Sequence, residues 1–124
     1  MNAGRKEPAP VFTDGPAMQD LVIGDLGPED ELILCDVEER KAVGLRKYGT
    51  LLKAHNGRNA TMDAYQEALD LVMYQRQCIE EAGAFCSERL LMSYRLGLTV
   101  VRYLRAELRD QEIAGCATPR SADT

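Results

Sequence analysis

An all-α fold is predicted by three stretches of helical sequence pattern, at about 28–48, 59–81 and 87–110. Apolar residues recur in each stretch at the three- and four-residue spacing of one helix face. Glycines separate the stretches, and their flanks lack the period-two alternation that would predict a hairpin. The chain of 124 residues has the length of one domain and is long enough to bury a core.

The first helix is expected to begin at Pro28 and to end before Gly49. Proline is favoured in the first turn, and the acids at 29–31 suit the positive end of the helix dipole. A glycine just past the last turn is a common helix terminator. Gly44, in the middle of this helix, indicates either close approach of another helix or ligand, or simple tolerance of a glycine.

The second helix is expected to begin at Asn59 or Thr61, both common N-caps, and to end at Gly83. An Asn-Gly pair predicts a turn in the loop before it. The third helix is expected to begin after Ser87 and to run to about Asp110. Its apolar residues spread over much of its circumference, so we expect oligomerisation to complete a bundle of three long helices.

A single helical domain is expected at 18–112, between two tails. Residues 1–17 are rich in proline and glycine, which predicts a flexible N-terminal tail or an extended arm. Within the domain, residues 18–27 are expected to form a short turn or an arm. Residues 113–124 are mostly small and polar, which predicts a disordered C-terminal tail.

The composition of the chain disfavours several classes of protein. The formal net charge of −5 disfavours nucleic-acid binding, because neutralising phosphates needs a basic surface. The sequence shows no apolar run long enough to span a bilayer and no secretory h-region, so we expect a cytoplasmic protein without a membrane partner. The four cysteines include no C-x-x-C pair and are expected to be buried thiols rather than a zinc site.

The chain has a single histidine, His55, so sites that need several histidines are excluded. These include metal sites built from several histidines and the repeated Glu-x-x-His motif of di-iron bundles. A Ser-His-Asp triad would lack a nucleophile elbow. Any metal chemistry here therefore uses oxygen ligands, which favour Mg²⁺ or Mn²⁺.

Each of the first two expected helices carries a pair of acidic residues that are one helical turn apart. Asp36 and Glu39 form one pair, and Glu67 and Asp70 form the other. Residues three apart share a helix face, and a short loop favours antiparallel packing that would bring the pairs together. Four facing carboxylates need divalent cations between them. The alternative is that both pairs are solvated.

These motifs resemble those of the all-α nucleoside triphosphate pyrophosphohydrolases, the MazG-like group. The usual signature of that group is Glu-Glu-x-x-Glu followed by Glu-x-x-Asp, and the second motif is present here. The runs RKYGTLL at 46–52, NGR at 56–58 and DAYQEALDLVMYQRQ at 63–77 are similar to the small phage branch, the MazZ branch. The first motif departs from the signature, because residues 35–40 read CDVEER. The resemblance covers roughly residues 32–82 and implies a MazG-like helical bundle.

The resemblance implies an enzyme that cleaves a (deoxy)nucleoside triphosphate between the α- and β-phosphates, releasing pyrophosphate. It implies two or three Mg²⁺ or Mn²⁺ ions per site, with Asp36, Glu39, Glu67 and Asp70 as ligands. Glu38 or Glu39 would act as general base. Substrate contacts are expected from the neighbouring cations, rings, amide and acid, namely Lys47, Tyr48, Asn56, Arg58, Asp63 and Tyr74.

Each substrate contact has a plainer alternative. Lys47 and Arg58 either bind the phosphate tail or are solvated cations. Asn56 either reads a base edge or only forms the turn. Asp63 caps the second helix, pairs with Arg58, or approaches the metal shell. The two tyrosines either stack on the base or sugar, or belong to the core.

The phage resemblance suggests (d)GTP as substrate, with dGMP supplied to the synthesis of a modified purine nucleotide. The alternative enzyme is a house-cleaning pyrophosphatase that removes dUTP, dCTP or a damaged nucleotide. A different class is a non-catalytic helical interaction protein whose acids only keep it in solution. As an enzyme, the chain is expected to form a homo-oligomer, a dimer or a tetramer.

Overall fold

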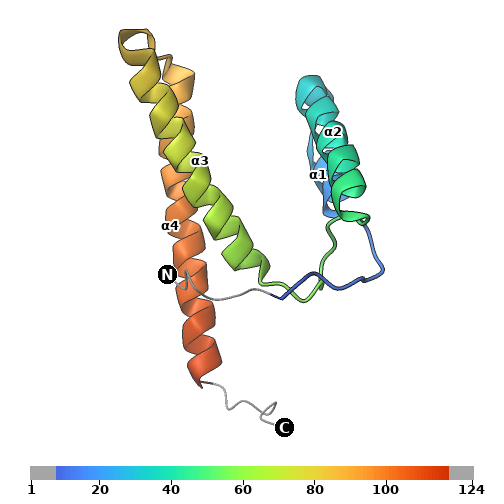
Figure 1. The fold of residues 1–124 in the computed structure, drawn as a ribbon. Helices are drawn as coiled ribbons and strands as arrows, with labels where there is room; N and C mark the ends of the chain where they lie inside the picture. The colour runs from blue at the N-terminus through green and yellow to red at the C-terminus, as the bar shows by residue number, and fades with distance from the viewer. Residues whose placement is uncertain (1–7, 118–124) are drawn as a thin grey trace. The chain divides into compact units, whose positions relative to one another are not determined.

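The computed structural model describes residues 8–117, and the regular secondary structure in this part of the chain is helical (Figure 1). The all-α prediction is confirmed for these residues, which contain no β-strand beyond one isolated bridge. Within the same range, each helix is too short or too polar to traverse a lipid bilayer. The α-helices are α1 (Met18–Asp25), α2 (Glu31–Tyr48), α3 (Ala60–Ala82) and α4 (Glu88–Ala117).

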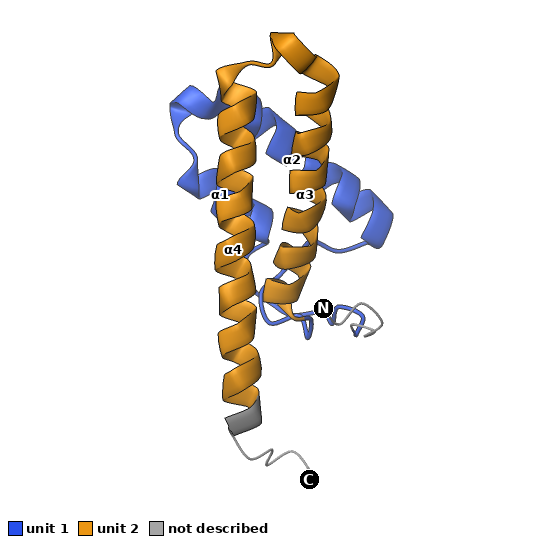
Figure 2. Ribbon diagram, turned by 90° about the vertical axis from the view of Figure 1, so that its left-hand side faces the viewer, with its two compact units in different colours: residues 1–58 blue, residues 59–124 orange. Residues whose placement is uncertain are grey.

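The chain divides into two compact units, residues 1–58 and 59–124 (Figure 2). The first unit holds α1 and α2, and the second holds α3 and α4. The boundary falls at the residue that caps the N-terminus of α3. Each unit therefore has its own helix pair and is described by itself.

In the first unit, α1 packs against α2. Residues 18–25, expected to be a turn or an arm, are helical, because packing stabilises a segment too short to hold a helix alone. Lys41 of α2 donates a hydrogen bond of 2.7 Å to Oδ1 of Asp20 on α1. That bond raises the pKa of Lys41 above its ordinary value of 10.5, and the nearby charge of Glu38 acts in the same direction.

The ends of α2 confirm the predicted boundaries. The 3₁₀ turn Pro28–Asp30 leads into the helix, and Asp30 accepts a hydrogen bond of 2.9 Å from the Gly27 N–H. Gly49 ends the helix with φ of 72°. That left-handed conformation costs glycine little, which explains why the chain stops being helical there.

Residues 8–17, expected to belong to a flexible tail or an extended arm, lie extended along the loop after α2. The Val11 N–H donates to the carbonyl of Asn56 at 2.7 Å, and the Met18 N–H donates to Leu52 at 2.8 Å. Ala17 forms the isolated bridge with Lys53 and is buried. These residues therefore form the extended arm, the second of the two alternatives, because long-range backbone hydrogen bonds hold them. Residues 1–7 lie outside the described residues.

In the second unit, α3 and α4 pack against each other. Their core centres on Met62, Tyr65 and Leu108, and Leu108 is only 2% exposed. Partly buried Leu69, Val101 and Leu104 pack around these three residues. The expectation of buried cysteines is wrong for Cys35 and Cys78, which are exposed.

The start of each helix in the second unit is capped as predicted. The side chain of Asn59 accepts a hydrogen bond of 3.0 Å from the Met62 N–H, and Ser87 accepts one of 3.1 Å from the Leu90 N–H. The end of α4 differs from the prediction, because the helix continues beyond Asp110 to Ala117. Residues 113–117 are thus helical rather than part of a tail, and 118–124 lie outside the described residues.

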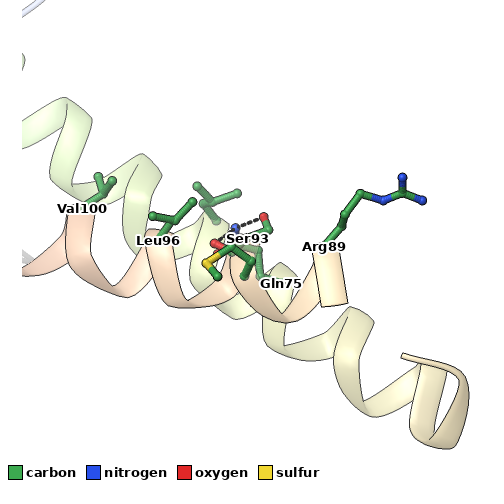
Figure 3. A pocket seen from close by; sticks show the side chains of 8 residues that line it. Gln75, Arg89, Ser93, Leu96 and Val100 are labelled. Atoms are coloured by element: carbon green, nitrogen blue, oxygen red, sulfur yellow. Dashed lines mark hydrogen bonds between the residues drawn. The ribbon is translucent and has the colours of Figure 1, made fainter. Parts of the chain in front are cut away.

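A buried amide joins α3 to α4 near the middle of the pair. Gln75 is 8% exposed, and its Nε2 donates to the carbonyl and the hydroxyl of Ser93 at 2.8 and 2.7 Å (Figure 3). Gly97 of α4 lies against it. A Cβ added at Gly97 would overlap Oε1 of Gln75 and come within 3.0 Å of a methyl group of Val72. Glycine at this position therefore permits the close approach of the two helices.

We expect Gly97→Ala to lower the free energy of unfolding by about 1–2 kcal/mol, because overlap with Gln75 outweighs the better helix propensity of alanine. Gly44→Ala in α2 is the matched control. No atom lies within 4 Å of a Cβ placed there, so this change should raise stability by up to about 1 kcal/mol. Urea unfolding followed by circular dichroism measures both. Equal gains in the two variants would contradict the close packing at Gly97.

Candidate functional site

The first acidic group lies on α2, where Asp36, Glu38 and Glu39 are all exposed. Asp36 and Glu39 stand one turn apart and therefore share a face. Glu38 differs from them, because its charge acts on Lys41, the residue that ties α2 to α1. The pair at 36 and 39 is thus not engaged in the packing of the first unit.

The second acidic group lies on α3. Glu67 and Asp70 are exposed, whereas Tyr65, Ala68 and Val72 between and beside them are buried. This alternation places the carboxylates on the part of the helix that the core of the second unit does not cover. The sequence predicted the shared face from the spacing of the pair, and their exposure is consistent with it.

The four predicted metal ligands form no ion pair within the described part of the chain, where the salt bridges join other residues. Two like charges one turn apart on a helix repel by a few tenths of a kcal/mol, and a divalent cation would reverse that repulsion. Carboxylate oxygens are the donors that Mg²⁺ and Mn²⁺ prefer. The donor chemistry of both pairs therefore fits these ions.

The four ligands are divided between the two units. Asp36 and Glu39 belong to the first, and Glu67 and Asp70 belong to the second. Across residues 8–117, no three His, Cys, Asp or Glu side chains form a group that could hold a metal ion. A complete ligand set would need both pairs, so their convergence stays a prediction.

The loop between α2 and α3 is organised by Asn56, which is 9% exposed. Its side-chain oxygen accepts a hydrogen bond of 3.1 Å from the Arg58 N–H, and Gly57 between them has φ of 85°. This arrangement is the side-chain turn that Asn commonly forms. Asn56 therefore has the turn-forming role that was one of its two alternatives, and a contact from it to substrate stays a prediction.

Arg58 is anchored to the N-terminal arm, because its Nη1 donates to the carbonyl of Pro8 at 2.9 Å. Asp63 is half-buried in the first turn of α3, where a negative charge suits the helix dipole. The cap of α3 is Asn59, so Asp63 contributes a favourable charge to the helix start rather than the cap. Whether either side chain reaches a substrate stays a prediction.

The two tyrosines of the predicted site are exposed, Tyr48 by 69% and Tyr74 by 66%. Packing in a core, the plainer alternative, therefore does not explain either ring. The ammonium group of Lys47 lies 5.1 Å from the centre of the Tyr48 ring, within the range of a cation–π contact. A cation and a flat ring thus lie together at the end of α2, a combination suited to a nucleotide.

An apolar groove between α3 and α4 was missed at the level of the sequence (Figure 3). Leu71 of α3 and Met92, Leu96 and Val100 of α4 line it. Met92, Leu96 and Val100 are spaced by four residues, and this spacing in the sequence indicates a second apolar row on α4 beside the core row.

Comparison with known proteins does not assign a family. No family model, no curated protein and no solved structure matches the chain. The function proposed below therefore rests on the residues themselves and on the resemblance of their motifs.

Proposed function

We propose that this chain is a metal-dependent nucleoside triphosphate pyrophosphohydrolase with a MazG-like fold, active as a homo-oligomer. The observation that carries the proposal is the two exposed carboxylate pairs, one on α2 and one on α3, that form no ion pair in the described part of the chain. Such pairs are weakly unfavourable by themselves and favourable with a divalent cation. The sequence around these pairs resembles the motifs of enzymes that release pyrophosphate.

The proposed ligands of Mg²⁺ or Mn²⁺ are Asp36, Glu39, Glu67 and Asp70. When bound, the ions would offset the negative charge that builds up on the phosphate oxygens during hydrolysis. The carboxylate of Glu38 or Glu39 takes the proton of the attacking water, which makes that residue the general base.

The remaining contacts bind and orient the substrate. Lys47 and Arg58 are the proposed partners of the phosphate tail, because a triphosphate needs cations in addition to the metal ions. The exposed rings of Tyr48 and Tyr74 provide flat surfaces on which a base or sugar can stack. Asn56 and Asp63 complete the proposed set from the loop and the start of α3.

The proposed substrate is (d)GTP, which rests on the resemblance to the phage branch. Its product dGMP would supply the synthesis of a modified purine nucleotide for phage DNA. The alternative within the same reaction class is a house-cleaning enzyme that removes dUTP, dCTP or a damaged nucleotide.

A panel of ribo- and deoxynucleoside triphosphates with Mg²⁺ tests the reaction. We expect a nucleoside monophosphate and pyrophosphate, with dGTP or GTP turned over fastest and no turnover in EDTA. Chromatography of the nucleotides together with a pyrophosphate assay identifies both products. Release of orthophosphate and a nucleoside diphosphate would contradict the proposed cleavage position.

The competing class is a non-catalytic helical interaction protein, and the exposed apolar residues of α4 favour it. Thermal unfolding separates the two classes. A metal–nucleotide site predicts a higher melting temperature with Mn²⁺ and a non-hydrolysable triphosphate, because ligand binds only the folded state. The absence of both a shift and turnover would favour the interaction protein.

A further inference from the structure

A row of exposed apolar residues, which we call the α4 stripe, runs along α4 apart from its core. Its members are Met92, Leu96, Val100 and Tyr103, which are 51%, 58%, 45% and 75% exposed. Spacings of three and four residues place them on one helix face. The core residues of α4 occupy other positions, so the stripe lies outside the core of the α3–α4 pair.

The α4 stripe borders the apolar groove described above. Leu71, 46% exposed, adds apolar surface from α3, and the buried Gln75 and Gly97 also line the groove (Figure 3). Side chains of a further helix fit into a groove of this kind, as ridges fit into grooves in helix packing. An apolar row of this length on an exposed helix face is typical of an interaction surface.

Opposite charges lie at the two ends of the α4 stripe. Arg89 stands three residues before its first member, and Glu107 stands four residues after its last. Both side chains are exposed, and neither forms an ion pair within residues 8–117. Arg89 extends from the groove at that end (Figure 3). The stripe thus carries a positive end and a negative end, about 27 Å apart along the helix.

This charge pattern matches a second copy of the stripe in the antiparallel direction. With residue 98 at the centre, Leu96 lies opposite Val100 of the second copy, and Arg89 lies opposite its Glu107. Two-fold symmetry repeats each pair. A parallel arrangement would instead place Arg89 against Arg89 and Glu107 against Glu107, which like-charge repulsion disfavours.

We infer that a second copy of this chain docks on the α4 stripe, with the two α4 helices antiparallel and centred near residue 98. The inference rests on the homo-oligomer of the proposed function but not on the hydrolysis. It assigns the interface to one face of α4 and gives it a register.

Cysteine cross-linking tests the direction and the register. In a chain whose four native cysteines are replaced by serine, Leu96→Cys and Val100→Cys are made as separate proteins. After mixing and treatment with a short thiol cross-linker, we expect dimers that contain one chain of each variant. Leu96→Cys alone should give at least about tenfold less dimer, because its thiols lie further apart. Cross-linking of Leu96→Cys chiefly to itself would indicate a parallel pair and overturn the inference.

A charge exchange tests the end contacts in the otherwise native chain. Arg89→Glu and Glu107→Arg should each weaken the dimer, by about tenfold in Kd at low salt, and the double variant should restore it. Arg95→Glu, at an exposed position of α4 outside the stripe, is the matched control and should leave Kd unchanged. Sedimentation equilibrium measures the Kd of the native chain and of these four variants.

Two further results overturn the inference: a native chain that is monomeric by mass, or a double variant as weak as the single ones. The hydrolysis assay separates this from the proposed function. Turnover with a failed charge exchange would reject the interface alone. A restored dimer without turnover of any triphosphate would reject the enzyme and leave the interface standing.

Discussion

Glu67→Gln is expected to abolish pyrophosphate release while leaving α3 folded. The side chain is exposed and forms no ion pair in the described part of the chain, so folding does not depend on its charge. A metal ligand, in contrast, loses most of its affinity when a carboxylate becomes an amide. Loss of several kcal/mol of transition-state stabilisation corresponds to at least about a hundredfold lower kcat/KM. Asp70→Asn should act in the same way.

Glu81→Gln is the matched control, because Glu81 is also exposed on α3 but lies outside the acidic pair. It should retain full turnover. Thermal unfolding without metal should show that all three variants fold, with the two site variants slightly more stable, since one repulsive pair is relieved. Retained hydrolysis in both Glu67→Gln and Asp70→Asn would reject the metal site.

Leu108→Ala should produce the largest loss of stability among single changes in the second unit. Leu108 is 2% exposed and packs in the core with Met62 and Tyr65. Removing its buried atoms leaves a cavity between two helices, which typically costs about 2–5 kcal/mol of unfolding free energy. Urea unfolding followed by circular dichroism measures the change.

Leu32→Ala provides the comparison for that experiment. Leu32 is 80% exposed on α2, so the same chemical truncation should change the free energy of unfolding by less than about 0.5 kcal/mol. A similar loss in both variants would mean that burial at Leu108 does not govern the stability of the second unit.

Helix ends that carry a cap or a terminating glycine were predictable because these signals are local, whereas the end of α4, which extends beyond the predicted Asp110, was not. Gly49 ends α2 through its own backbone conformation, and Asn59 and Ser87 cap the next helices through hydrogen bonds three residues long. The shared faces of the acidic pairs were predictable for the same reason, since a spacing of three residues decides them. None of these features requires knowledge of a distant part of the chain.

Non-local contacts decided the features that the sequence did not reveal. The helix α1 depends on packing and on the bond between Asp20 and Lys41. The extended arm depends on hydrogen bonds such as that from Val11 to Asn56, far apart along the chain. The groove beside Gln75 depends on how closely α3 and α4 approach. The spacing of residues within one helix does not predict such contacts, because their partners lie many residues away in the sequence.

The composition and spacing of this chain thus establish its three long helices, most of their termini and the acid pairs on two of them. Its tertiary structure alone shows the helix α1 and the buried faces of the second unit, and it separates the core of α4 from a second apolar row. The physical reason is that capping and periodicity act within a few residues, whereas burial depends on which helices pack together.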